Sequence, residues 1–397
     1  MAIEGADTVW VLISAALVLL MLPGLALFYG GLVQRKNVLS SMMHSFVAMG
    51  IMALEWVLIG YSLAFADGNW FVGGLGHAFL RGIDAYSVTG TIPTYAFIAF
   101  QGMFAIITPA LISGAIVGRV KFKSYIAFIA LWGLIVYAPV CHWIWGGGFL
   151  TGEALDFAGG TVVHITSGVS SLAILTYIGK RRGFGVDPLK PHNVTLTLLG
   201  GGLLWFGWFG FNAGSALAAN EIAALAFITT LIAPAAAGFV WMALEWRHFG
   251  YPTALGFATG VLAGLVAITP CAGFVTPMAA IPIGMITSFV CYKAVGLKER
   301  FGYDDSLDAF GVHGVGGIVG ALLVGVFASV GGTGLLLGNT SQMLIQLQGV
   351  VITIVYAAVG TLLIGFILNR TIGLKVSESE ENIGLDKTQH GEIAYNV

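Results

Sequence analysis

Charged residues are the scarcest class in this chain. Asp, Glu, Lys and Arg together make up 9% of the 397 residues, whereas roughly 25% is usual in soluble domains. A soluble protein of this length could not cover its surface with so few charges, and hydrophobic residues here reach 57%. The composition therefore predicts a polytopic membrane protein. The formal net charge of −2 also argues against a nucleic-acid partner, which requires a basic surface.

Cysteine is nearly absent. The three cysteines, Cys141, Cys271 and Cys291, form no Cys-x-x-Cys pair, so the sequence predicts neither a disulfide framework nor a cysteine metal cage. We expect no metal, no cofactor and no enzymatic reaction. The acidic N-terminus also lacks a basic n-region, and we therefore expect no cleavable signal peptide and interpret the first apolar run as a span.

Glycine, by contrast, is abundant, with 57 residues, about twice the usual share. Small residues let membrane helices approach closely, so the fold class that we expect is an all-α membrane protein rather than a β-barrel. Apolar runs of about 20 residues can cross the hydrocarbon core as helices. About eleven such runs are present, at residues 9–29, 39–65, 94–118, 125–145, 161–179, 194–212, 221–246, 253–270, 278–296, 308–330 and 342–369.

Basic residues predict the orientation of these spans. Sixteen of the 17 Lys and Arg residues fall in the loops after odd-numbered spans or in the C-terminal tail, and only Arg81 falls on the other side. Because basic loops stay in the cytoplasm, we expect the N-terminus outside and the C-terminus inside. The chain then divides into a membrane domain, residues 1–375, and a cytoplasmic tail, residues 376–397. We expect the acidic start of the tail to be flexible and its last segment, 384–395, to dock on the inner face.

The spans fall into two groups of five. The basic loop 179–188 separates the first group, about residues 9–179, from the second, about 194–330, and the long helix 342–369 is left over. A five-span unit repeated in tandem must enter the membrane from opposite sides. The halves would then be inverted repeats with a site near the midplane. His164 and His313 each lie in the fifth span of one half, at equivalent positions.

These two histidines are the first functional candidates, because an ionisable side chain inside the membrane is costly. The structural alternative is that each ring is satisfied by a hydrogen bond to a neighbouring helix. Since they form a symmetry-related pair flanked by glycines, we favour the interpretation that both rings line one pore and hydrogen-bond each other. Such a pair offers a donor and an acceptor to a small polar solute in an apolar lumen.

Aromatic and hydroxyl side chains form a second candidate site near the outer face. Phe104 lies in the third span, Trp145 ends the fourth, and Ser215 follows the sixth. Aromatic belts at membrane interfaces are routine, so the alternative for any single ring is an interfacial anchor. Rings and a hydroxyl that converge from several spans are instead suited to bind a small cation.

Three acidic residues lie at the ends of the histidine-containing spans. We expect Asp156, at the outer start of the fifth span, mainly to cap that helix and thereby to shape the cation site. A long-range stabilisation of the cation is compatible with this role. Asp305 and Asp308 are expected at the inner mouth, as solvated acids near the start of the tenth span.

Four segments together resemble the Amt/Mep/Rh ammonium transporters, and specifically the Amt branch. They are Asp156–His164, Trp208–Ser215, Asp308–Val315 and His390–Tyr395, in the order of the family, and the resemblance covers essentially the whole chain. It implies an eleven-span subunit with inverted five-helix repeats, assembled as a homotrimer with one pore per subunit. It also implies docking of a cytoplasmic PII-type regulatory protein of nitrogen metabolism on the inner face.

The same resemblance implies roles for individual residues. Trp145, Phe104 and Ser215 would recruit ammonium, or its analogue methylammonium, at an outer vestibule supported by Asp156. Phe104 would form a gate with Phe211. Ammonium would lose a proton near this gate, and ammonia would pass along the twin histidines His164 and His313, with or without separate transfer of the proton.

Three rival interpretations share part of this pattern. A membrane cytochrome could use both histidines as axial haem ligands, although it needs a wider pocket than a glycine-packed interface provides. A sensor could bind ammonium and signal through its cytoplasmic tail to PII proteins without bulk transport. A passive gas channel would have the same fold as a transporter.

Overall fold

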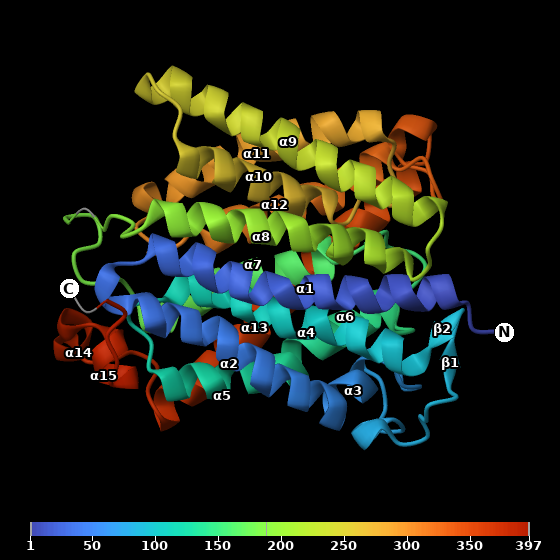
Figure 1. Cartoon of the computed structure of the whole chain (residues 1–397), viewed down its shortest axis with the longest axis horizontal. Coiled ribbons are helices and arrows are strands. Elements are labelled where there is room, and N and C mark those ends of the chain that lie inside the picture. Colours follow the sequence, from blue (N-terminus) through green and yellow to red (C-terminus); the bar gives the residue numbers. More distant parts are fainter. Residues whose placement is uncertain (1, 188, 396–397) are drawn as a thin grey trace.

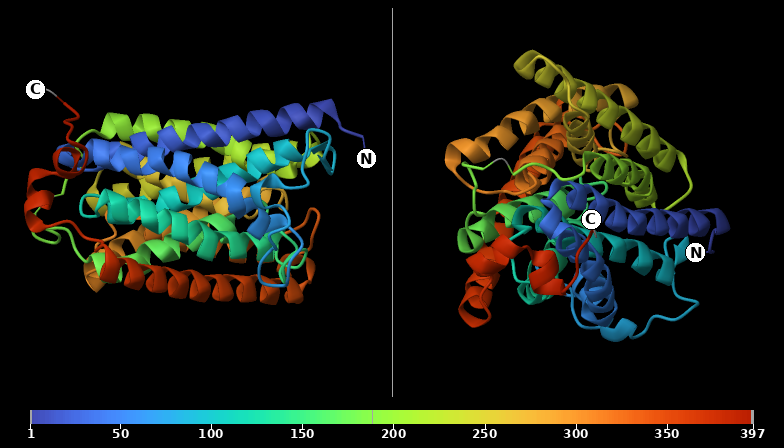
Figure 2. Two further views of the ribbon diagram at one scale, coloured as in Figure 1. Left: turned by 90° about the horizontal axis from the view of Figure 1, so that it is seen from below. Right: turned by 60° about the vertical axis from the view of Figure 1, so that its left-hand side comes forward.

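Most helices of the bundle run roughly along one long axis. The computed structural model describes residues 2–187 and 189–395. The N-terminus and the C-terminal helices lie at opposite ends of that axis (Figure 1, and in a second orientation Figure 2). An odd number of spans requires this arrangement. We call the two ends the N face and the tail face.

Helices dominate the described part of the chain, with one short hairpin. In chain order the elements are α1 (Gly5–Leu32), η1 (Arg35–Asn37), α2 (Val38–Glu55), η2 (Trp56–Gly60), α3 (Tyr61–Phe65), η3 (Ala78–Leu80), β1 (Val88–Thr89), β2 (Ile92–Pro93), α4 (Thr94–Ile116), α5 (Phe122–Trp132), η4 (Gly133–Tyr137), α6 (Ala138–Trp145), η5 (Gly160–Ile165), α7 (Thr166–Ile178), α8 (Val194–Ala213), η6 (Gly214–Ala216), α9 (Glu221–Phe249), α10 (Ala254–Ile268), α11 (Pro277–Phe301), η7 (Phe310–Gly314), α12 (Val315–Phe327), η8 (Leu335–Leu337), α13 (Thr340–Thr371), α14 (Glu378–Ile383) and α15 (Leu385–His390). The antiparallel strands β1 and β2 pair Thr89 with Ile92.

The predicted spans coincide with these helices. Within the described ranges, ten helical runs are long and apolar enough to cross a membrane, and each matches one predicted span. The remaining span, 253–270, corresponds to α10, an apolar helix of 15 residues that is mostly buried. The prediction of an all-helical membrane protein with about eleven spans is confirmed.

Local sequence explains where several spans begin. Asn220 caps α9 by accepting the backbone N–H groups of Ile222 and Ala223 at 3.1 and 3.0 Å. Asn193 and Thr253 cap α8 and α10 in the same way. A side-chain oxygen at this position satisfies N–H groups that have no partner inside the helix. The span predicted to begin at residue 221 begins there.

Two spans, η5–α7 and η7–α12, cross at the centre of the bundle. Each consists of a π-helical turn followed by an α-helix, and we call them the broken spans. A side chain at Gly168 of α7 would collide with the backbone of Gly314 in η7. Reciprocally, a Cβ at Gly317 of α12 would approach the backbone nitrogen of Ile165 to 3.0 Å. Small residues permit such close contact, and inverted repeats would produce reciprocal contacts of this kind. The contacts support the predicted halves, 9–179 and 194–330, which stay a prediction.

The tail is folded onto the tail face rather than flexible at its acidic start. Ser377 and Glu380 form a capping box at the start of α14. The side chain of Asn37 accepts the backbone N–H of Leu385 at 2.9 Å, and Asp386 accepts that of Ser40 at 2.8 Å. The expected flexibility of the acidic segment is therefore wrong for the described residues, because caps and buried contacts hold it. The last segment docks on the tail face, as expected.

A buried ion cluster joins three loops at the tail face. Arg119 is fully buried and donates to the backbone oxygen of Asp304 at 2.5 Å. Arg181 donates to the carboxylate of Asp304 through Nε at 2.9 Å and Nη2 at 2.7 Å. Burial opposes the charged carboxylate, but hydrogen bonds from Arg181 and the charge of Arg119 hold the pKa of Asp304 below its ordinary value of 3.8.

Replacing Asp304→Asn should strongly destabilise the protein, because it leaves the buried Arg119 and the partly buried Arg181 without their counter-charge. Loss of one partner of a buried pair costs about 3–5 kcal/mol. Thermal unfolding in detergent measures the effect, with Glu299→Gln on the exposed end of α11 as the control. The native pKa of Asp304 is lowered, so its stabilisation is present above about pH 4 and is lost as the pH falls through that native pKa. Equal melting temperatures for the two variants would contradict this account.

Candidate functional site

His164 and His313 meet where the broken spans cross. Their Nδ1 atoms lie 3.2 Å apart and their rings are inclined by 17°. Both rings are buried, with 1% and 5% of each residue exposed. A hydrogen bond needs one donor and one acceptor, so one of the two Nδ1 atoms carries no proton. At least one ring of the pair is therefore neutral in this arrangement.

This geometry decides against the haem interpretation. Axial histidines bind iron from opposite sides of a macrocycle, so the iron and the macrocycle must lie between the two rings, but the rings of His164 and His313 are in direct contact, with centroids 5.2 Å apart. The Nδ1 atoms of His164 and His313 are at hydrogen-bond distance, and glycines pack the helices that carry them. In the described residues, no three His, Cys, Asp or Glu side chains form a group that could hold a metal ion.

Each histidine lies in a π-helical turn, His164 in η5 and His313 in η7. Such turns are rare and frequently occur at functional sites. An aspartate eight residues earlier caps each broken helix. Asp156 accepts the N–H groups of residues 159–162 at 2.6–3.0 Å. Asp305 accepts those of Ala309 and Phe310 at 3.0 and 2.8 Å.

The expectation of solvated acids at the tenth span is wrong for Asp305. Asp305 is only 2% exposed, because its carboxylate is used to cap the broken helix. Asp308 forms an ion pair with Lys298 of α11, with the two charged atoms 2.5 Å apart. It also lines the cavity that contains the histidines, and 26% of its side chain is exposed. Its position is therefore compatible with the expected mouth of the pore.

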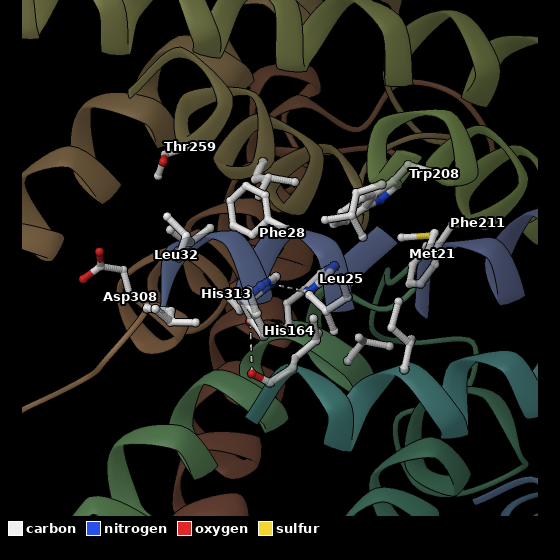
Figure 3. A pocket seen from close by; sticks show the side chains of 18 of the residues that line it. Met21, Leu25, Phe28, Leu32, His164, Trp208, Phe211, Thr259, Asp308 and His313 are labelled. Carbon is white, nitrogen blue, oxygen red and sulfur yellow. Dashed lines mark hydrogen bonds between the residues drawn. The ribbon is translucent and has the colours of Figure 1, made fainter. Parts of the chain in front are cut away.

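The histidine cavity is almost entirely apolar. In Figure 3, Phe211 and Met21 mark one end of it and Asp308 the other, with the two hydrogen-bonded rings between them. The indole of Trp208 stacks on His164 at 5.5 Å between ring centroids. The Nε2 atom of His164 is buried and has no hydrogen-bond partner within the described part of the protein. The other lining residues come mainly from α1, α4, α8 and α10, among them Leu25, Phe28, Tyr29, Ile107, Leu111, Leu204, Leu255, Thr259 and Leu262.

Two phenylalanines close the cavity toward the N face. The rings of Phe104 and Phe211 lie 4.4 Å apart between centroids, and each residue is 1% exposed. Phe211 lines the histidine cavity, whereas Phe104 lines a second pocket that is nearer the N face. The predicted gate residues thus pack together between the two cavities.

The second pocket contains the predicted cation site. Trp145, Phe104 and Ser215 line it together, and the rings of Phe104 and Trp145 meet edge to face at 5.8 Å. Ser215 donates its hydroxyl hydrogen to the backbone oxygen of Phe211 at 2.8 Å, which leaves its oxygen lone pairs as acceptors. We call this pocket the vestibule.

Asp156 supports the vestibule without lining it. Its backbone oxygen accepts the indole N–H of Trp145 at 2.9 Å, while its carboxylate is used by the four backbone donors of η5. The carboxylate is not part of the pocket lining. Burial raises the pKa of Asp156 to about 6, and the backbone hydrogen bonds oppose that shift. The structure thus favours the structural role over direct contact with a cation.

Comparison with known proteins decides the family. The model of the Ammonium Transporter Family matches residues 9–395. This chain belongs to that family. An ammonium transporter from Aquifex aeolicus is 51% identical over 407 residues, which cover 100% of this chain and 94% of the relative. The family consists of transporters and not of enzymes.

Solved structures agree with this assignment. The crystal structure of Saccharomyces cerevisiae Mep2 has a TM-score of 0.91 at 35% identity, covering 100% of this chain and 92% of that chain. A structure described as a sensor Amt protein has a TM-score of 0.90 at 32% identity, covering 97% of this chain and 98% of that chain. The ammonium-transporter fold is therefore established for this member.

Several lining residues were not predicted from the sequence. Phe65, Thr151 and Leu217 join the predicted residues around the vestibule. They lie at the ends of spans or in loops, and no periodic pattern marks them. Tyr29 of α1 lines the histidine cavity and donates to the backbone oxygen of Leu111 at 3.1 Å. A tyrosine within a predicted span is a polar signal that could have suggested it.

Proposed function

We propose that this chain transports ammonium across the membrane, recruiting the cation in the vestibule and conducting ammonia along the histidine pair. The observation that carries the proposal is the sequence of sites along one path. A pocket lined by aromatic rings and Ser215, a pair of packed rings and an apolar cavity with two hydrogen-bonded histidines follow one another from the N face toward the tail face.

Recruitment rests on the vestibule rings and Ser215. The faces of aromatic rings attract cations by about 0.5–2 kcal/mol, and the serine oxygen accepts a hydrogen bond that ammonium, unlike potassium, can donate. No carboxylate lines the pocket, which favours ready release of the cation. Trp145, Phe104 and Ser215 are the recruiting residues in this proposal, and Asp156 holds Trp145 in place.

Passage beyond the gate requires loss of a proton. Transfer of an isolated ion into an apolar medium costs tens of kcal/mol in the Born limit. Neutral ammonia costs far less to transfer, because it loses only a few hydrogen bonds to water. Potassium cannot lose a proton and is therefore excluded by the same cavity. The gate of Phe104 and Phe211 separates the region where the cation is stable from the region where only ammonia is.

The histidine pair gives ammonia hydrogen-bonding partners in that cavity. His164 and His313 share one hydrogen between their Nδ1 atoms, and the buried Nε2 of His164 is free to donate to ammonia or to accept from it. A hydrogen-bonding partner at this point lowers the free-energy cost of dehydrating ammonia, while the cavity stays unfavourable for an ion. The route taken by the proton forms no part of this proposal.

Removing one ring tests the pore. We expect His164→Ala to lower ammonium uptake into proteoliposomes roughly tenfold, the equivalent of about one buried hydrogen bond, or to admit potassium through the enlarged cavity. His248→Ala, which deletes the same side chain outside the pore, serves as the control. Unchanged uptake together with unchanged exclusion of potassium would show that the twin histidines have no role in the transport path.

Weakening the vestibule tests recruitment. Trp145→Leu combined with Ser215→Ala removes a cation–π contact and a hydrogen-bond acceptor, together about 2 kcal/mol. The apparent KM for methylammonium uptake should rise roughly tenfold or more. Trp70→Leu, at an exposed tryptophan outside the vestibule, should leave the KM unchanged. An unaltered KM in the double variant would exclude both residues from the binding site.

Orientation and assembly are further parts of the proposal. The tail face holds the loops after odd-numbered spans and nearly all Lys and Arg residues, which supports a cytoplasmic tail and an external N-terminus. The resemblance to the Amt branch supports a homotrimer and docking of a PII-type protein on the tail face. Protease accessibility of the tail in sealed vesicles tests the orientation, and light scattering and PII pull-down test the two assemblies.

A sensor is the second candidate, because one solved relative of similar length is described as a sensor Amt protein. In such a protein ammonium would bind in the vestibule and the folded tail would transmit the occupancy. Saturable ammonium flux in proteoliposomes without any partner supports transport, whereas binding without flux would support the sensor.

A further inference from the structure

His142 occupies an unusual position between two carbonyl oxygens. It lies in α6, three residues before Trp145, and is 2% exposed. Its Nδ1 is 2.9 Å from the backbone oxygen of Ala64, at the end of α3, and its Nε2 is 2.9 Å from that of Asn69. A carbonyl oxygen can only accept a hydrogen bond. Both ring nitrogens therefore face acceptors.

A neutral imidazole cannot satisfy this geometry. It carries one N–H group, so its second nitrogen would present a lone pair to the lone pairs of a carbonyl oxygen at 2.9 Å. The doubly protonated ring donates to both oxygens. His142 also lies in the last turn of α6, where the helix dipole favours a positive charge.

No counter-ion accounts for the position of the ring. Within the described residues, His142 forms no ion pair and no side-chain hydrogen bond other than those to the two carbonyl oxygens. The ionisable groups on the segments that pack around it are Tyr61 on α3, Asp67 in the loop after α3, Tyr137 on η4, Cys141 on α6, Glu153 after α6 and Asp156 before η5. The groups that face the two ring nitrogens are thus backbone carbonyl dipoles rather than carboxylates.

The two bonds join segments that line the vestibule. Phe65, directly after Ala64, lines the vestibule, and so does Trp145 at the end of α6. A Cβ at Gly146 would collide with the backbone oxygen of Ala64, so the ends of α3 and α6 already touch. The neighbouring Trp143 donates to the backbone oxygen of Phe71 at 2.7 Å, which ties the same loop to α6.

We propose that His142 is a positioning residue that holds the vestibule in its cation-binding shape only while its ring carries two protons. Loss of one proton breaks one of the two bonds and frees either the end of α3 or the loop at Asn69. Phe65 and Trp145 then lose their fixed separation, and recruitment of ammonium weakens. The proposal rests on the proposed function of the vestibule, but the protonation state of the ring can be measured without transport.

Solid-state ¹⁵N NMR on the reconstituted full-length protein, labelled at histidine, tests the charge state directly. The difference between wild type and His142→Gln identifies the signals of His142. At the pH at which methylammonium binds most tightly we expect two protonated ring nitrogens. A neutral tautomer at that pH overturns the proposal, whatever the transport data show.

Uptake of methylammonium tests the consequence, with concentrations expressed as the charged species at each external pH. The KM of wild type should rise toward alkaline pH, by roughly tenfold for one lost hydrogen bond to a charged group. His142→Gln should have a raised KM at every pH and no such dependence, whereas the control His77→Gln should behave as wild type. A doubly protonated ring with identical pH profiles in wild type and His142→Gln would overturn the role in positioning. Absence of uptake in wild type would refute the proposed function while the NMR result still stands.

Discussion

The close crossing of the two broken spans is the contact on which the rest of the site depends. Gly168 and Gly314 have no side chains, so η5 and η7 approach until the Nδ1 atoms of the histidines are 3.2 Å apart. A methyl group at Gly168 would meet backbone atoms that cannot rotate away. The pore is narrow because glycines permit the helices to touch, and it is largely apolar because most of the remaining lining comes from aliphatic and aromatic side chains.

Desolvation then determines what can pass. The vestibule supplies rings and a hydroxyl oxygen, which suit a cation that keeps part of its hydration. Beyond Phe104 and Phe211 the cavity has few polar groups apart from the histidine pair. In the proposed function, recognition of charge and passage of a neutral solute therefore take place in two separate compartments. The buried aspartates contribute by capping the broken helices, which keeps their charges away from the path of the solute.

The sequence predicted the spans and the twin histidines well, because hydrophobic length and two rare intramembrane histidines are local signals. It did not predict that His164 and His313 lie in π-helical turns, since such turns depend on packing against the other half. Burial of Asp305 was missed because the sequence does not show which backbone donors a carboxylate will meet. The sequence of the tail did indicate a helix, because Ser377 and Glu380 have the spacing of a capping box. Its acidic composition nevertheless suggested flexibility. The two acceptors of His142 are backbone atoms, which no residue pattern records.

The central claim is that the pore distinguishes ammonium from potassium, an ion of similar size, by the ability of ammonium to give up a proton. Current and solute uptake in wild-type proteoliposomes on a solid-supported membrane, after equal pulses of ammonium and potassium, test this claim most directly. The account predicts saturable uptake of ammonium and no potassium current above that of protein-free liposomes. A potassium current comparable to the ammonium signal would contradict it.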